Sequence, residues 1–292
     1  MKVAVTGARG FLGRRVCDFL FSFGHDVTGI DVASTGICPY LLLPRDITKP
    51  MRPLEHIDAV IHLAALANPR TCDANPTNAF DVNVNGTSQV LQMALASGAK
   101  KVIFSSSAHV YGISPRYQPT NESHPLYLQN TYTTTKILGE QLCQLYFENY
   151  GLSYTTLRLY NAYGPDQAAG YFIPDQILKA KQGRIDLLGG NVTKDWVYVE
   201  DVADAFVKAL TSNFVGPINI GTGIETSLST VAGIIAKETK AELVVTDIAN
   251  PTRMCADRDR ASRVLGWSPK IGLDSGLFTL LGSPMRTVAE VA

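Results

Sequence analysis

The stretch that decides the fold is Thr6-Gly7-Ala8-Arg9-Gly10-Phe11-Leu12-Gly13, which joins an apolar run at residues 2–6 to an amphipathic segment at 11–23. We predict a strand and a helix there, with the glycines forming the turn between them. Glycine permits a tight turn and a close approach of the backbone to a ligand. The free N–H groups and positive partial charge of a helix N-terminus favour a pyrophosphate. The spacing Gly-x-x-Gly-x-x-Gly is therefore interpreted as a variant of the dinucleotide-binding pattern.

An acidic residue in the right place supports this interpretation. The strand predicted at 26–31 ends in Asp31, about 20 residues beyond the turn, where a carboxylate accepts the hydroxyl groups of an adenosine ribose. The same carboxylate repels a 2′-phosphate, so we expect NAD rather than NADP. Arg9 could pair with such a phosphate and keeps NADP as the alternative. Ser34, shortly after Asp31, is also assigned to the cofactor.

The first half of the chain alternates strands with helices, the pattern of a parallel sheet with helices on both faces. We predict strands at 2–6, 26–31, 59–63, 101–105 and 153–159, and helices at 11–23, 76–97 and 130–149. The fold class is α/β: a Rossmann doubly wound parallel sheet with a smaller C-terminal substrate-binding lobe.

Beyond residue 165 the alternation loosens and Gly, Pro and Asn become more frequent. We place an NAD-binding domain at 1–165 and the substrate-binding lobe at 166–292, intertwined with the first part rather than independent. The predicted elements are helices at 174–181, 200–210, 228–238 and 258–265, and a strand at 217–220. Residues 283–292 carry little pattern and are expected to fray.

Composition excludes several classes of protein. In 292 residues the hydrophobic fraction is 46% and the charged fraction 18%, as in folded globular proteins. The net charge of zero gives no overall attraction to nucleic acid or to an anionic membrane. The apolar run at 59–67 is about half of a membrane-spanning helix. Five scattered cysteines suggest neither disulfides nor a metal site. Residues 1–5 show no leader, so we expect a cytoplasmic protein.

Tyr132 and Lys136 form the candidate acid/base pair. They lie four residues apart in a predicted helix and so share one face. The pKa of a phenol is ordinarily near 10, and a neighbouring ammonium stabilises the phenolate and brings it into a working range. Ser105-Ser106-Ser107 ends an apolar strand, at the edge where open α/β sheets bind ligands. A hydroxyl there could bond the reacting oxygen beside the tyrosine.

Taken together, these patterns resemble those of the extended short-chain dehydrogenases/reductases, in the NAD-dependent sugar epimerase/dehydratase family and closest to its UDP-glucose/galactose 4-epimerases. The likeness runs from about residue 2 to 282. Beyond the segments above, it rests on Asp46-Ile47, Ile61-His-Leu-Ala-Ala65, Asn83-Val-Asn-Gly-Thr87, Arg158-Leu-Tyr-Asn-Ala-Tyr-Gly-Pro165, Asp195-Trp-Val-Tyr-Val-Glu-Asp-Val202, Ala256-Asp257 and Leu265-Gly-Trp267.

The resemblance implies a role for each matched residue. Tyr132 is the acid/base, Lys136 lowers its pKa and holds the nicotinamide ribose, and Ser107 binds the sugar oxygen. The remaining cofactor residues are Gly7, Gly10, Phe11, Leu12, Gly13, Asp31, Asp46, Ile47, Leu63, Ala64, Ala65, Asn83, Ser105 and Tyr160. The resemblance also implies a nucleotide-sugar substrate and a homodimer that pairs the helices at 76–97 and 130–149 into a four-helix bundle.

One departure from the family pattern concerns the type of reaction. Dehydratases and decarboxylases of the family carry a carboxylate directly after the catalytic hydroxyl, where this chain has Ala108 and His109. The pattern therefore favours a 4-epimerase. His109 is open to two interpretations: a second acid/base next to a carbonyl, or, as we prefer, a histidine of the pocket wall.

A second departure concerns the substrate end. Asp247 stands where the family has a diphosphate-binding arginine, and Lys194 replaces another arginine. Lysine offers charge but no bidentate fork. We assign Ser107, Asn161, Lys194 and Arg253 to the substrate, with Arg253 as the replacement clamp.

The predicted function is an NAD-dependent 4-epimerase that forms a transient 4-keto sugar. The alternatives are a keto-sugar reductase or sugar dehydrogenase with net redox and, less favoured, a cofactor-binding protein without turnover. The contacts to the sugar and to the nucleotide base are expected to come from the variable second lobe.

Overall fold

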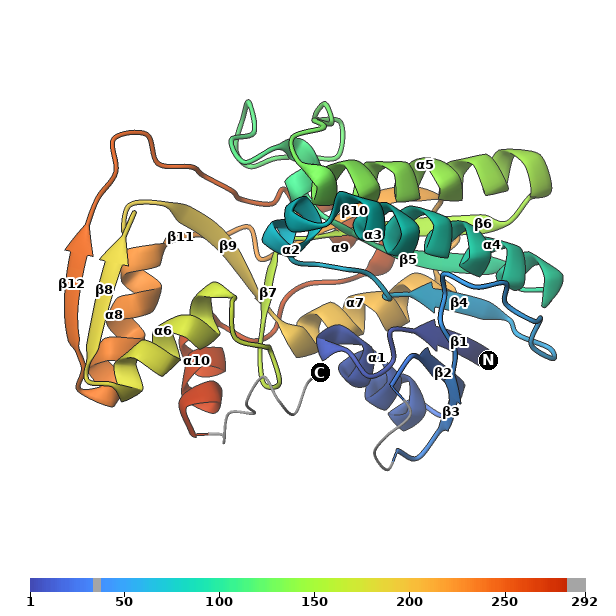
Figure 1. The fold of residues 1–292 in the computed structure, drawn as a ribbon, viewed down its shortest axis with the longest axis horizontal. Helices are drawn as coiled ribbons and strands as arrows, with labels where there is room; N and C mark the ends of the chain where they lie inside the picture. The colour runs from blue at the N-terminus through green and yellow to red at the C-terminus, as the bar shows by residue number, and fades with distance from the viewer. Residues whose placement is uncertain (34–37, 283–292) are drawn as a thin grey trace.

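A computed structural model describes residues 1–33 and 38–282. Ser34 and the expected fraying of 283–292 lie outside the described residues. Figure 1 shows two parts, a large one around the central sheet and a smaller lobe at the side.

The central sheet has seven strands in the order β10-β6-β5-β4-β1-β2-β3, and every adjacent pair is parallel. The strands are β1 (Lys2–Thr6), β2 (Asp26–Asp31), β3 (Leu41–Pro44), β4 (Ala59–His62), β5 (Lys101–Ser107), β6 (Ser153–Leu159) and β10 (Gly216–Ile220). This order confirms the predicted doubly wound Rossmann sheet. β5 runs two residues beyond its predicted end, so Ser107 is the last residue of the strand.

Helices cover both faces of this sheet, as parallel strands require. One face carries α1 (Phe11–Ser22), α7 (Val199–Thr211) and α9 (Asp259–Leu265), and the other carries α4 (Gly86–Ala96) and α5 (Thr131–Tyr150) (Figure 1). Because neighbouring residues of a strand point to opposite faces, Val3 and Val5 face the first group of helices while Ala4 faces the second. The pairing of α4 and α5 with a second copy of the chain stays a prediction.

The single helix predicted at 76–97 is wrong in one respect. The segment consists of α3 (Pro76–Phe80), a π-helical turn (Asp81–Asn85) and then α4, and a further short helix, α2 (Pro69–Ala74), precedes it. Asn83, in the π turn, is buried, and its amide both donates to the Leu66 carbonyl and accepts from the Leu66 N–H. These bonds tie the wider turn to the segment after β4, which the apolar periodicity of the sequence did not reveal.

The smaller lobe has its own core. Parallel strands β8 (Arg184–Leu188) and β12 (Glu242–Thr246) pack with α6 (Phe172–Lys181), α8 (Leu228–Thr239) and α10 (Leu273–Gly282). Strands β11 (Glu225–Ser227), β9 (Thr193–Tyr198) and β7 (Asn161–Tyr163) form a three-stranded sheet next to the central one. After α7, the chain returns to the central sheet as β10. The boundary at residue 165 stays a prediction, and the two parts are interleaved along the chain.

Among residues 1–33 and 38–282, no helix combines the length and the apolar character that crossing a membrane requires.

Candidate active site

A cavity of about 640 Å³ opens at the carboxyl ends of the central strands, between the sheet and the smaller lobe. Its walls come from the turn after β1, the segment after β4, the ends of β5 and β6, and, in the smaller lobe, α6 and β9. Open α/β sheets bind their ligands at this edge.

The Gly-rich turn is shaped by close backbone contacts. Gly7 has a φ of 69°, its N–H donates to the Ile30 carbonyl at 2.8 Å, and a Cβ atom added to it would lie 2.7 Å from the Ala64 nitrogen. A Cβ atom on Gly13 would lie 1.9 Å from the Gly7 carbonyl oxygen. Gly10 precedes α1 without a side-chain cap, which leaves the first N–H groups of the helix to a ligand. The turn therefore fits the pyrophosphate of a dinucleotide.

Asp31 lies beside this turn. Its carboxylate accepts the Arg9 N–H at 2.8 Å and the Ala33 N–H at 3.0 Å. A carboxylate has further lone pairs, so these two bonds orient Asp31 and still leave it able to accept ribose hydroxyl groups.

The structure brings most of the predicted residues to one cavity. Those in its wall are Gly7, Gly10, Phe11, Leu12, Gly13, Leu63, Ala65, Ser105, Ser107, Tyr132, Lys136, Tyr160, Asn161 and Lys194.

Others lie outside the wall, each for a visible reason. Asp46 is exposed, and its carboxylate accepts the N–H and hydroxyl of Thr48, both at 2.9 Å. Ile47 is buried in the core. The Ala64 N–H donates to Thr6 at 3.3 Å, and Asn83 lies behind Leu66. Asp31 lies beside the Gly-rich turn. The cofactor contacts expected of all five residues stay predictions.

Tyr132, Ser107 and Lys136 meet at the centre of the cavity wall. Burial raises the pKa of the Tyr132 phenol, and a hydrogen bond with the Ser107 side chain opposes this. The Lys136 ammonium donates to the Ser105 carbonyl at 2.9 Å and lies 5.9 Å from the centre of the Tyr132 ring. Burial lowers the pKa of Lys136 to about 8. An acid/base, a hydroxyl and a cation are thus placed together, as hydride chemistry at a carbinol needs.

His109 lies beside this group. It belongs to a short 3₁₀ helix (Ala108–Tyr111) that follows β5, and its ring meets the Tyr132 ring edge-on at 6.3 Å. Its backbone N–H donates to the Ser107 hydroxyl at 3.2 Å. Burial, with a smaller effect of Lys194, lowers the pKa of His109 to about 4. At neutral pH the imidazole is uncharged, which agrees with a histidine of the pocket wall.

The end of the cavity next to the smaller lobe carries a partly buried cation. Lys194 on β9 points its ammonium at the Met254 sulfur, 3.3 Å away, and burial lowers its pKa. Asn161 donates from its amide to the Asp195 carbonyl at 3.1 Å. Arg253 does not reach the cavity: it is exposed and forms a two-pronged ion pair with Glu225, with both bonds at 2.6 Å. The structure therefore does not support Arg253 as the clamp.

Several wall residues escaped sequence analysis. Phe172 and Trp196 pack ring against ring at 5.6 Å, and Tyr171, Gln167 and Met254 line the same end. Trp196 is part of a segment that carried the family resemblance, which gave a signal for it. The others come from loops and helix ends whose positions depend on the fold of the smaller lobe.

A comparison with known families gives the decisive observation: residues 3–221 match the NAD dependent epimerase/dehydratase family. The chain belongs to this family. It is an enzyme of the extended short-chain dehydrogenase/reductase type, and its cofactor is NAD.

Individual epimerases are similar to this protein in sequence or structure over nearly the whole chain. A putative UDP-glucose 4-epimerase of Methanocaldococcus jannaschii is 35% identical over 94% of this chain and 95% of its own length. The crystal structure of the Thermotoga maritima UDP-glucose 4-epimerase with UDP-glucose superposes with a TM-score of 0.88 at 28% identity, covering 96% of this chain and 97% of its own. The Thermus thermophilus UDP-glucose 4-epimerase, in complex with NAD, gives 0.85 at 25%, covering 97% and 100%.

Metal chemistry has no candidate centre in the part of the chain that the structure describes, where no three His, Cys, Asp or Glu side chains gather as a metal site would require.

Proposed function

We propose that this epimerase-family enzyme interconverts two nucleotide sugars that differ in configuration at C4, through a transient 4-keto sugar. The observation that carries the proposal is the meeting of Tyr132, Ser107 and Lys136 in the wall of the cavity that the Gly-rich turn also lines.

NAD, held along the Gly-rich turn, would supply the hydride acceptor for C4 and the hydride donor for the return step. Tyr132 takes the proton of the sugar hydroxyl as the hydride leaves, and gives it back when the opposite face is reduced. Ser107 bonds the same oxygen, and the Lys136 ammonium stabilises the phenolate. Since burial raises the pKa of Tyr132, this ammonium and the cationic nicotinamide are needed to bring the phenol into range.

The surroundings of Tyr132 favour epimerisation over elimination of water. Ala108 carries no proton donor, and His109 is uncharged at neutral pH. The carboxylate among the described wall residues, Asp166, is ion-paired with Arg15 at 3.5 Å. A second proton transfer at the neighbouring carbon, which a dehydratase needs, thus lacks a positioned acid.

Lys194 supports a nucleotide-sugar substrate. A partly buried ammonium whose partner is a sulfur atom is costly to desolvate, and an anionic group entering the cavity would offset that cost. The diphosphate of a nucleotide sugar is such a group.

The alternative with net redox uses the same three residues but releases its cofactor in each turnover. The test is to purify the protein without added cofactor, denature it and assay the released NAD and NADH, and separately to follow epimer formation from UDP-glucose. Near-stoichiometric cofactor that survives gel filtration, with epimer formed, supports the proposal. A protein that must be supplied with NAD or NADH, consumed in step with product, is a dehydrogenase or reductase instead.

A further inference from the structure

Helix α5 approaches strand β5 unusually closely, one turn after Lys136. A Cβ atom on Gly139 would lie 2.4 Å from the Phe104 ring, so the absence of a side chain there sets the distance between the helix and the strand. The Lys136 ammonium lies 5.2 Å from the centre of the same ring. The spacing of α5 and β5 therefore controls where the catalytic lysine lies.

A buried hydrogen bond follows directly. Ser106 lies two residues after Phe104 and so faces α5 as well. Its hydroxyl donates to the Glu140 carboxylate at 2.6 Å. Arg158 on β6 binds the same carboxylate through two bonds, of 2.9 Å and 2.6 Å, and both side chains are about nine-tenths buried or more, 5% exposed for Arg158 and 11% for Glu140.

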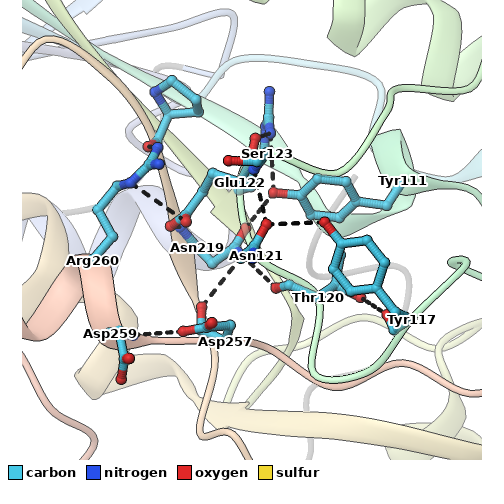
Figure 2. A network of polar contacts seen from close by, with 12 residues as sticks. Tyr111, Tyr117, Thr120, Asn121, Glu122, Ser123, Asn219, Asp257, Asp259 and Arg260 are labelled. Atoms are coloured by element: carbon cyan, nitrogen blue, oxygen red, sulfur yellow. Dashed lines mark hydrogen bonds and ion pairs between the residues drawn. The ribbon is translucent and has the colours of Figure 1, made fainter.

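Arg158 is in turn fixed from its other side. It donates to the Tyr111 hydroxyl at 3.0 Å, and Tyr111 donates to the Asn219 side chain at 2.6 Å. Figure 2 shows this network continuing from Asn219 to Glu122, which accepts the Asn219 N–H at 2.8 Å and pairs with Arg260 at 3.4 Å. The bonds join β6, β10 and the 3₁₀ helix after β5, and two-sided restraint of Arg158 keeps Glu140 in place.

Three successive residues of β5 are thus joined to α5. The Ser105 carbonyl accepts a hydrogen bond from the Lys136 ammonium, the Ser106 hydroxyl donates to Glu140, and the Ser107 side chain lies near enough to the Tyr132 phenol to lower its pKa. The bond between Ser106 and Glu140 contains no proposed catalytic group. It lies between the contact of Ser105 with Lys136 and that of Ser107 with Tyr132, and both of these contain one.

We propose that Ser106, Glu140 and Arg158 are positioning residues that hold Ser107 in register with Tyr132 and Lys136 for proton transfer. The inference rests on the proposed function, because it concerns the acid/base of that reaction. Reacting groups must be held within a fraction of an ångström, and a misplacement of about 1 Å can cost about a hundredfold in rate.

Electrostatics gives the cluster a second effect. Burial lowers the pKa of Lys136, whereas a negative charge on Cys72 or Glu140 acts to raise it. Burial raises the pKa of Cys72 and keeps it a neutral thiol near neutral pH, which leaves Glu140 as the charged group. The other titratable groups around this ammonium are Tyr132 and His62, and the latter is uncharged at neutral pH because burial lowers its pKa to about 3. Glu140 therefore helps Lys136 to stay protonated.

The first test compares Ser106→Ala with Thr156→Val. Thr156 lies on β6 between Tyr154 and Arg158 and is fully buried. Its hydroxyl has no hydrogen-bond partner among the residues that the structure describes, so it is a matched control. The readout is the single-turnover rate at which a nucleotide sugar reduces bound NAD, which is common to epimerase and dehydrogenase. We expect Ser106→Ala to lose about tenfold in this rate with unchanged KM and cofactor content, and Thr156→Val to match the wild type. Equal rates in the wild type and Ser106→Ala, or equal losses in both variants, would overturn the proposal.

The second test needs neither cofactor nor substrate. Competitive acetylation of lysines as a function of pH, read by mass spectrometry, gives the pKa of Lys136, which we expect near 8 in the wild type. Glu140→Gln removes a negative charge, so the Lys136 pKa should fall, while Ser106→Ala keeps the charge and should leave it near the wild-type value. An unchanged Lys136 pKa in folded Glu140→Gln contradicts the electrostatic part. If Glu140→Gln does not fold, the Ser106→Ala rate decides.

The proposed function and the proposed positioning role are contradicted by different results. A wild-type enzyme that reduces its bound NAD with a nucleotide sugar but returns no epimer overturns the proposed function alone. A Ser106→Ala enzyme with the wild-type rate overturns the positioning role alone.

Discussion

The cofactor end and the substrate end of the cavity are built differently. At the cofactor end the backbone makes the site, and a single added carbon at Gly13 would collide with the Gly7 carbonyl. At the substrate end, side chains from several elements make the site, and in the described chain the indole nitrogen of Trp196 and the amide oxygen of Gln167 are buried without a hydrogen-bond partner. A backbone site is recognised from glycine spacing, whereas a side-chain site depends on the folded lobe. The difference predicts that changes at the first end affect folding and cofactor retention, and changes at the second affect substrate affinity.

The largest effect is expected at the boundary between the two ends. Tyr132→Phe removes the proton-transfer group and should lower kcat by about a thousandfold, or about 4 kcal/mol, since general acid–base catalysis contributes about 10²–10⁴-fold. NAD should remain bound, because the Gly-rich turn is untouched. Turnover and released NAD are measured on the same sample. Wild-type turnover in this variant would mean that Tyr132 is not the acid/base, and a wild type without turnover would point to a cofactor-binding protein.

The cofactor end, which the backbone builds, is tested by replacing glycine with alanine in two different helices. Gly13→Ala forces a Cβ atom to 1.9 Å from a carbonyl and should cost at least about 3 kcal/mol, with loss of NAD. Gly233→Ala in α8 meets nothing closer than 4.0 Å and should stabilise the protein by up to about 1 kcal/mol through helix propensity. Chemical denaturation measures both. A tolerated Gly13→Ala would show that the turn relaxes more easily than its contacts suggest.

The side-chain end is tested at Lys194. Lys194→Gln removes the partly buried ammonium and should raise KM about tenfold, or about 1.4 kcal/mol, with little change in kcat. Steady-state kinetics with UDP-glucose is the measurement. A fall in kcat at unchanged KM would place Lys194 at the reacting atoms. It would contradict the expectation that changes at the substrate end affect only substrate affinity.

His109 should have a small effect on rate and none on pH dependence. Its pKa near 4 leaves it uncharged from about pH 6 upward, so His109→Gln should change kcat by less than about threefold and leave the pH profile there unaltered. Loss of activity at rising pH should instead follow Lys136, whose ammonium loses its proton through about pH 8 in the free protein. If the wild-type rate falls toward low pH and this fall disappears in His109→Gln, His109 is a second acid/base instead.

The smallest effect is expected at Arg253. Its exposed pair with Glu225 lies outside the cavity wall, and surface ion pairs contribute little. Arg253→Ala should therefore change KM by less than about twofold in the assay used for Lys194→Gln. A tenfold increase in KM would show that Arg253 leaves Glu225 and reaches the substrate.

Sequence reasoning located the central sheet because its strands follow local patterns. It also placed Tyr132 and Lys136 on one helix, where the structure has them, and their catalytic roles stay predictions. Strand and helix periodicities placed β1, β2, β6 and α5 within a residue of their observed ends. The π turn at Asp81–Asn85 could not be foreseen, since it depends on the long-range bonds of Asn83. In the smaller lobe, neither β8 nor β12 was predicted, because the two strands pair with each other across a long stretch of sequence. Arg253 was assigned by sequence proximity, and its pairing with Glu225 appears only in three dimensions.

The return of the chain to the central sheet has a consequence for biosynthesis. On a ribosome, β6 emerges with one edge unpaired and remains so until residues 216–220 have been made, because β10 is the strand that pairs with it. An open strand edge is a template for pairing with other chains. The nascent protein is thus expected to be most prone to misassociation between the synthesis of β6 and that of β10, and a ribosome pause in that interval would lengthen the exposure.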